Sequence, residues 1–173
     1  VIDLAGSFSD DPADRRAVAW EVHKACRDTG FFYITGHGVP AELTERHLAM
    51  AAEFFALPLE EKLKIDGTGG GAMRGYEPMA AQTLDEGTPP DLKEGYQMGI
   101  EVGEDHRWYP DMGKTAINLW PDRPEGFRPH FETYSETMIA LARHLMRVVA
   151  LSLELDEDYF EDAMRSPMIE TRI

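Results

Sequence analysis

The longest hydrophobic pattern in the chain lies between residues 127 and 148. Apolar side chains recur there at spacings of three and four residues, and they are Phe127, Phe131, Tyr134, Met138, Leu141, Leu145 and Val148. Such spacing keeps the side chains on one face of a helix, whereas the alternation of a strand would scatter them over two faces. The pattern therefore predicts an amphipathic helix of about 27 residues.

Four shorter helices are predicted from their capping residues. Asp11 suits the N-cap of a helix that begins with a proline, and Gly30 suits the left-handed residue that follows its end. Pro40 and Pro58 each open a further helix, and Asp156 suits the cap of another. The expected helices cover residues 12–28, 40–56, 58–65 and 156–164.

Strands are predicted where aromatic and β-branched residues alternate or cluster. The aromatic run at residues 31–35 favours a buried strand. Shorter extended segments are expected at residues 1–4, 73–78, 94–100 and 168–173. Because the last of these ends on Ile173, we expect a final strand without a partner and a chain that stops inside its domain. The absence of an initiator Met leads us to expect a few residues before Val1 as well.

The composition is that of a globular protein, with 43% apolar and 28% charged residues. No apolar run approaches the roughly 20 residues of a membrane span, and the net charge of −15 argues against nucleic acid or an anionic membrane as a partner. The single cysteine, Cys26, excludes an intramolecular disulfide and suits a cytoplasmic location. Because Cys26 shares a helical face with Val18 and Val22, we expect it in the core.

A glycine-rich segment at residues 66–72 fits the pattern G-x-G-x-x-A at Gly67, Gly69 and Ala72. A nucleotide site needs a strand before this pattern and a helix after it. Here a helix precedes the pattern, and Gly75 and Pro78 prevent a helix from following. We therefore expect a mobile loop without a nucleotide, and a second mobile loop at residues 83–90.

The histidines form no recognisable iron site. A facial triad needs a histidine and a carboxylate two residues apart on a strand, with a second histidine elsewhere. The sequence has no His-x-Asp, and within His130-Phe131-Glu132 the first and third side chains would point about 200° apart on a helix. We therefore expect structural roles, in turns or loops or on helix surfaces, for His23, His37, His47, His106, His130 and His144.

Two arginines, Arg74 and Arg172, lie in segments predicted to be extended. A guanidinium that enters a core is costly unless an anion meets it, and a carboxylate meets it best through two hydrogen bonds. That carboxylate could belong to one of the chain's 32 acidic residues or to a bound ligand. The residues favour an internal salt bridge but leave both possibilities open.

Six segments in series carry a resemblance to a known family. They are Gly30–Pro40, Phe54–Ile65, Arg74-Gly-Tyr76, Asp91–Gly99, Asn118-Leu-Trp-Pro121 and Phe127-Arg-Pro129. In this order they resemble the N-terminal region of the isopenicillin N synthase-like, 2-oxoglutarate- and Fe(II)-dependent dioxygenases, and they cover nearly the whole chain. The resemblance implies an α+β fold in which residues 1–165 form a helical support layer with the first strands. Residues 166–173 would form the first strand that enters a jelly-roll core, the remainder of which is absent.

The resemblance also implies the cofactors and their place. In the family, a His-x-Asp and a later histidine hold Fe(II), and an Arg-x-Ser holds 2-oxoglutarate. These motifs lie beyond residue 173, so the resemblance assigns no catalytic residue and no metal ligand to this chain. It implies instead that this stretch binds substrate, through Arg74, Tyr76, Gln97 and Arg172 and, from the adjoining loop, Gln82 and Thr83. Arg172 would point into the iron cavity and hold a carboxylate.

The implied function is the coupling of 2-oxoglutarate decarboxylation to hydroxylation, desaturation or cyclisation of a small organic substrate. This stretch would supply pocket residues and a lid at residues 66–90. Two alternatives remain open from the sequence. One is a family oxidase that does not use 2-oxoglutarate, and the other is a non-catalytic interaction module that keeps only the support layer. The oligomeric state stays open.

Overall fold

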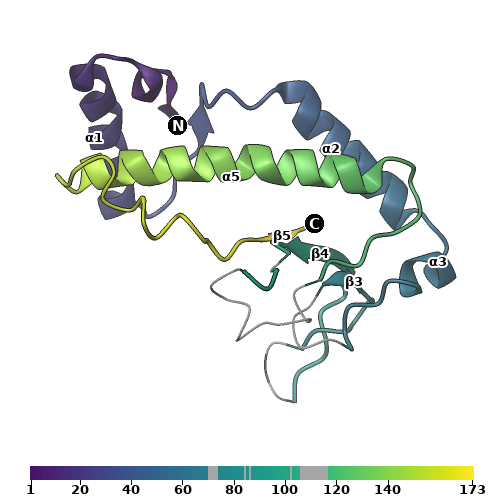
Figure 1. Ribbon diagram of the computed structural model, residues 1–173. Helices are drawn as coiled ribbons and strands as arrows, with labels where there is room; N and C mark the ends of the chain where they lie inside the picture. Colours follow the sequence, from purple (N-terminus) through teal and green to yellow (C-terminus); the bar gives the residue numbers. More distant parts are fainter. Residues whose placement is uncertain (70–73, 84, 86, 102, 106–116) are drawn as a thin grey trace. The chain divides into compact units, whose positions relative to one another are not determined.

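The computed structural model describes residues 1–69, 74–83, 85, 87–101, 103–105 and 117–173. Within it the chain divides into two compact units. The first unit comprises Val1–Leu43 and Glu136–Pro167, and the second comprises Thr44–Ser135 and Met168–Ile173. Figure 1 follows the order of the elements along the chain.

The first unit packs short strands and helices around its own core. It contains strand β1 (Ile2–Asp3), the short 3-10 helix η1 (Ala5–Phe8), helix α1 (Pro12–Asp28), strand β2 (Ile34–Thr35) and the C-terminal part of helix α5 (Phe127–Ser152). β1 and β2 pair in parallel. The buried core side chains are Ile2, Leu4, Val18, Ala19, Val22, Leu141 and Val148.

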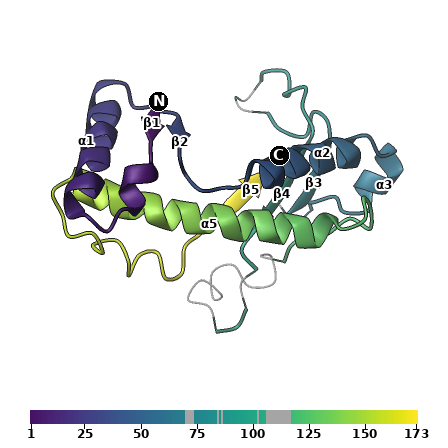
Figure 2. The ribbon, with the colours of Figure 1, turned by 90° about the horizontal axis from the view of Figure 1, so that it is seen from above.

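The second unit holds a small antiparallel sheet. Its helices are α2 (Ala41–Phe55, of which all but the first turn lies in this unit), α3 (Leu59–Leu63) and the first turns of α5. Its strands are β3 (Gly75–Glu77), β4 (Gly95–Gly99) and β5 (Glu170–Arg172), in the order β3-β4-β5. Figure 2 shows the three strands side by side. Because β5 pairs with β4, the expectation that the final strand has no partner is wrong.

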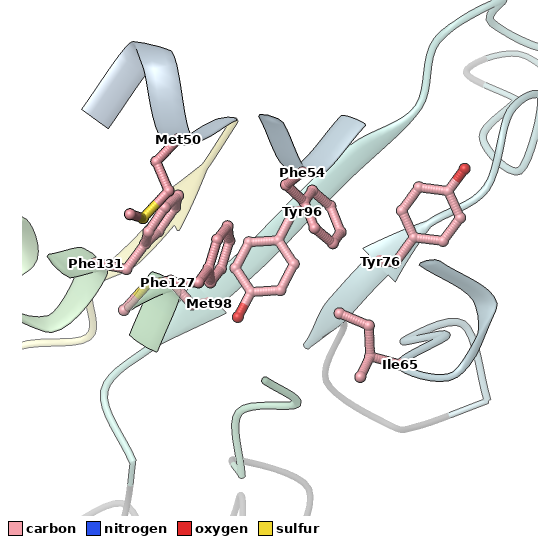
Figure 3. Close-up of a cluster of buried hydrophobic side chains, with 8 residues drawn as sticks. All are labelled: Met50, Phe54, Ile65, Tyr76, Tyr96, Met98, Phe127 and Phe131. Atoms are coloured by element: carbon pink, nitrogen blue, oxygen red, sulfur yellow. The ribbon is translucent and has the colours of Figure 1, made fainter. Parts of the chain in front are cut away.

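An aromatic cluster forms the core of the second unit. Phe54 of α2, Tyr96 of β4 and Phe127 of α5 lie with ring centroids 5.1 to 5.5 Å apart, and Figure 3 shows the three rings next to one another. Phe127 also stacks on Phe131 at 3.9 Å. Each of these side chains is at most 1% exposed. Edge and stacked contacts of this kind add to the stabilisation that burial alone provides.

Most of the predicted elements are confirmed, and three expectations about the first unit are wrong. In the aromatic run at residues 31–35 only Ile34–Thr35 pairs as a strand, while Phe31 and Tyr33 are 83% and 81% exposed. Residues 157–164 form successive turns and not the helix expected over 156–164. Cys26 is exposed and not in the core, because the buried stripe of α1 ends at Val22, one turn before it. No helix in the described part of the chain is long and apolar enough to cross a membrane.

The glycine-rich segment begins in a hydrogen-bonded turn. The carboxylate of Asp66 accepts hydrogen bonds from the amide and the hydroxyl of Thr68, and the amide of Gly67 donates to the carbonyl of Tyr76 at 2.9 Å. A Cβ on Gly67 would lie 2.5 Å from the carbonyl oxygen of Arg74. These contacts place residues 66–68 in a defined turn, while the expected mobility of residues 66–72 and 83–90 stays a prediction; residues 70–72 lie outside the described residues.

His47 is buried in the second unit, so the expectation of a helix-surface histidine is wrong for it. Its side chain is 4% exposed and stacks on Tyr134 with ring centroids 3.7 Å apart. Burial and then the neighbouring His130 lower the pKa of His47 to about 4. Nδ1 of His47 and Nε2 of His130 are buried and have no hydrogen-bond partner among the described residues. His106 lies outside the described residues.

We expect the stability of the protein to fall as the pH drops from about 6.5 to about 4, because unfolded His47 binds a proton near its ordinary pKa and folded His47 binds one only near 4. Protonation of His47 should lower the free energy of unfolding by on the order of 3 kcal/mol over that pH range. His47→Phe keeps an aromatic ring against Tyr134. In this variant the free energy of unfolding should depend less on pH over the same range. Urea unfolding at several pH values measures both proteins, and equal slopes would contradict the assignment.

Candidate functional site

The two faces of the β3-β4-β5 sheet differ in chemistry. In the observed register Glu77 lies opposite Gly95, Gln97 opposite Arg172, and Gly99 opposite Glu170. Because side chains alternate along a strand, these residues share one face of the sheet. The other face carries Tyr76, Tyr96, Met98 and Ile173, which belong to the aromatic core or pack against it. The sheet therefore presents a polar face on one side and closes the core with the other.

Arg172 forms an ion pair with a buried carboxylate on this polar face. Its Nη2 contacts Oε2 of Glu77, whose side chain is only 3% exposed, and it also donates to Oε1 of Gln82 at 3.2 Å. A Cβ on Gly95 would lie 3.3 Å from the Glu77 carboxylate and 3.5 Å from Nε of Arg172. The glycine therefore leaves the space in which the pair sits. The partner of Arg172 is therefore an acidic residue of the chain itself, Glu77 of β3.

A second ion pair lies beside the first. Nη1 of Arg74 is 3.0 Å from Oε1 of Glu170, and Oε2 of Glu170 accepts from the amide Nε2 of Gln97 at 2.8 Å. Arg74 is buried, with its side chain 3% exposed, and a Cβ on Gly99 would fall 2.3 Å from its Nη2. Any larger residue at position 99 would displace the guanidinium. Arg74 thus holds Glu170, and Glu170 in turn holds the side-chain amide of Gln97.

Gly75 explains why Arg74 reaches the polar face. By simple alternation Arg74 would share the apolar face with Tyr76. Gly75 has a φ of 111°, a conformation that glycine adopts at little cost and other residues avoid. The backbone therefore turns just before β3, and the guanidinium packs against Gly99 on the polar side.

The polar face opens into a hollow of about 340 Å³. Its lining comes from all three strands and from the loop after β3, and it consists of Glu77, Ala81, Gln82, Thr83, Gln97 and Arg172. The loop is fastened at its base, because the amide of Asp91 donates to the carbonyl of Gln82 at 2.8 Å and Lys93 contacts Oε1 of Gln82. The hollow therefore combines charged and amide side chains on a fixed sheet.

Four of the six residues expected at a substrate site meet in this hollow: Gln82, Thr83, Gln97 and Arg172. Arg74 is joined to them through Glu170 but does not line the hollow. Tyr76 lies on the opposite face, 1% exposed, where its hydroxyl donates to Glu94 at 2.5 Å. Burial and this hydrogen bond raise the pKa of Tyr76. The structure does not bring Tyr76 to the other five.

Glu77 and Glu170 belong to the polar face, although sequence reasoning did not single them out as site residues. Glu170 lies two residues before Arg172 in β5, so alternation along the strand puts the two side chains on one face. The position of Glu77 depends on the pairing of β3 with β4, which no local pattern reveals. Two carboxylates, each paired with an arginine, do not make a metal site. The described residues contain no group of three or more histidine, cysteine, aspartate or glutamate side chains that could hold a metal ion, so they do not fit Fe(II).

Comparison with known proteins identifies the family. A family model described as the N-terminal region of the non-haem dioxygenases, "non-haem dioxygenase in morphine synthesis N-terminal", matches residues 1–123. The chain belongs to this family. The resemblance to the 2-oxoglutarate- and Fe(II)-dependent dioxygenases is thereby confirmed.

Relatives and solved structures agree with this assignment. The 2-oxoglutarate-Fe(II) type oxidoreductase hxnY of Emericella nidulans is 38% identical over 166 residues, which are 93% of this chain and 47% of that protein. A protein of the 2OG-Fe(II) oxygenase family from Caulobacter crescentus has a TM-score of 0.80 at 27% identity, over 95% of this chain and 53% of that one. A full-length Neurospora crassa protein solved in complex with alpha-KG and 5-formyluracil has a TM-score of 0.73 at 26% identity, over 92% and 46%.

The chain spans about half the length of the curated relatives it matches. The structural matches confirm the expected α+β fold class, with the helical support layer and a few strands of the jelly-roll oxygenases. The hollow on the β3-β4-β5 sheet is therefore a feature of the N-terminal part of a non-haem dioxygenase fold.

We expect Arg172→Met to lower the free energy of unfolding by about 2 to 3 kcal/mol, because it leaves the buried carboxylate of Glu77 without a counterion. The double variant Arg172→Met with Glu77→Gln should lose less than the single variant, since no buried charge remains. Chemical denaturation measures both.

The matched control is Arg147→Met, which breaks the exposed ion pair with Glu161, 51% and 55% exposed. Its effect should stay below about 1 kcal/mol. A double variant that is as unstable as the sum of its single variants would contradict the coupling of Glu77 and Arg172.

Proposed function

We propose that the whole protein is an Fe(II)- and 2-oxoglutarate-dependent oxygenase that couples decarboxylation of 2-oxoglutarate to oxidation of a small organic substrate. The family match over residues 1–123 carries this proposal. The name of the Emericella relative and the alpha-KG and 5-formyluracil complex of the Neurospora protein support the cofactors and a small-molecule substrate. Iron supplies the oxidising chemistry in such enzymes, and the protein binds and orients the substrate and excludes water. We propose a cytoplasmic location, for which the single cysteine is suited.

We propose further that the hollow on the polar face forms part of the substrate site. Gln82, Thr83, Gln97 and Arg172 line it together, although they lie up to 90 residues apart in the sequence. Buried ion pairs hold two of its side chains in place, which reduces the cost of ordering them when a ligand binds. Residues 81–83, in the loop after β3, line one side of the hollow and would act as part of a lid.

In the whole protein we expect succinate to form only when Fe(II), 2-oxoglutarate and O2 are all present, and to form faster when a substrate is added. Succinate is measured by chromatography, with a chelator as the control. A folded protein that forms no succinate with iron, 2-oxoglutarate and a panel of small organic compounds would overturn the proposed function.

In the whole enzyme Arg172→Lys should raise KM for the substrate or uncouple 2-oxoglutarate consumption from substrate oxidation, on the order of tenfold, while the melting temperature changes little. Lysine keeps the charge beside Glu77 but loses the planar arrangement of donors that the guanidinium offers. Arg147→Lys, on the exposed surface of α5, serves as the control. Unchanged kinetics with a lowered melting temperature would make Arg172 a purely structural residue.

A further inference from the structure

The contact with Glu170 fixes the orientation of the side-chain amide of Gln97. Its nitrogen lies 2.8 Å from Oε2 of Glu170, and a carboxylate oxygen only accepts hydrogen bonds. Glu170 is held through its other oxygen by the buried Arg74. The NH2 end of Gln97 therefore points to Glu170, and Oε1 is the end left for a ligand. Among the described residues none donates to this oxygen.

Donors lie on the same hollow. Arg172 is paired directly with Gln97 in the sheet register. Its hydrogen bonds to described residues both use Nη2, so Nε and Nη1 remain as donors. Oε1 of Gln82 accepts from Arg172 and from Lys93, so the NH2 end of Gln82 is also left to donate. The side-chain oxygen of Gln97 on β4, an acceptor, thus lies next to the guanidinium of Arg172 on β5, a donor.

The charges that line the hollow balance. Glu77 neutralises Arg172, and Gln82, Thr83 and Gln97 carry no charge. A further cation, Lys93, contacts Oε1 of Gln82 but does not line the hollow. The lining residues themselves offer a carboxylate ligand no net positive charge, and one of its oxygens would face the carbonyl oxygen of Gln97. A neutral ligand group that has a hydrogen-bond donor next to an acceptor would pair with both the Gln97 oxygen and the Arg172 guanidinium. A ligand that leaves either of these groups unpaired would bind less tightly.

We propose that the hollow binds a neutral amide-like edge, as in a lactam, a cyclic imide or a cis-amide, with its N–H on Oε1 of Gln97 and its carbonyl oxygen on Arg172. Glu170 and Arg74 are positioning residues that fix the direction of the Gln97 amide. The inference rests on the proposed function, because it takes the hollow to be part of the substrate site. It replaces the expectation that Arg172 holds a carboxylate.

Three small probes of similar size test the proposal on the whole protein: δ-valerolactam, N-methyl-δ-valerolactam and cyclohexanecarboxylate. The first has the N–H and the carbonyl, the second lacks the N–H, and the third is an anion. Titrations followed by the side-chain amide signals of ¹⁵N-labelled glutamine give the dissociation constants. We expect the lactam to bind about five- to tenfold more tightly than either of the others.

Variants distinguish the residue that contacts the ligand, Gln97, from the residue that orients it, Glu170. Gln97→Met removes the acceptor and should bring the ratio between the lactam and its N-methyl derivative to about one. Glu170→Gln leaves a single side-chain oxygen, which the guanidinium of Arg74 takes, so the new NH2 group faces Gln97. The Gln97 amide should then turn over, and the ratio should fall to about one. Glu101→Gln makes the same chemical change at an exposed site just after β4 and should leave the ratio unchanged.

Equal binding of the two lactams by the unmodified protein, tighter binding of the carboxylate, or a preference that survives in Gln97→Met would each overturn the proposal. The comparison of probes on the unmodified protein needs no variant, so a variant that fails to fold does not remove the test. Succinate formation from 2-oxoglutarate reports separately on the oxygenase function. Turnover without a lactam preference would remove this inference alone, and a lactam preference without turnover would remove the proposed function.

Discussion

The polar face of the β3-β4-β5 sheet depends on the aromatic packing of its other face. Tyr76 and Tyr96 are each 1% exposed and lie against Phe54 at ring centroid distances of 6.1 and 5.5 Å. Burial of side chains of this size contributes roughly 1.5 to 3 kcal/mol each. Because side chains alternate, seating these tyrosines in the core forces Glu77, Gln97 and Arg172 to the opposite face. A slip of one residue in register would bury the charges and expose the rings.

The charges on the polar face are arranged for specificity more than for stability. Removing two ions from water costs about as much as their attraction returns, so a buried ion pair adds little net stability, but removing one partner is expensive. Glu77 and Arg74 are each buried and each paired with a more exposed partner, Arg172 and Glu170. The exposed partners are therefore held in one geometry at the edge of the hollow. Glycines at positions 95 and 99 leave the room that both pairs need.

Local patterns in the sequence predict the helices well. The three- and four-residue spacing predicts α5, and Asp11 caps α1 through its bond to the amide of Ala13, as the sequence suggests. Exposure is predicted less well, because apolar character alone does not say which face of a short strand is covered. Phe31 and Tyr33 were expected to be buried but project outward, while Ile34 is half-buried against the core. The prediction for Cys26 fails for a similar reason, since a helical face is covered over only part of its length.

For the site residues, too, local patterns predict some positions, whereas others become visible only in the folded sheet. Alternation and the family resemblance bring Gln97 and Arg172 to one face, and both line the hollow. Tyr76 is misplaced because the positive φ of Gly75 turns the chain between it and Arg74, which a residue pattern does not reveal. The partner of Arg172 is 95 residues away, so the pairing with Glu77 becomes visible only in the folded sheet.

The most direct test of this account is a crystal structure of the whole protein with 2-oxoglutarate and a bound substrate or substrate analogue. The account predicts ligand atoms within hydrogen-bonding distance of Oε1 of Gln97 and of the guanidinium of Arg172, with the Glu170 contact to Nε2 of Gln97 preserved. A ligand bound elsewhere, with the polar face of the β3-β4-β5 sheet covered by other parts of the protein, would contradict it.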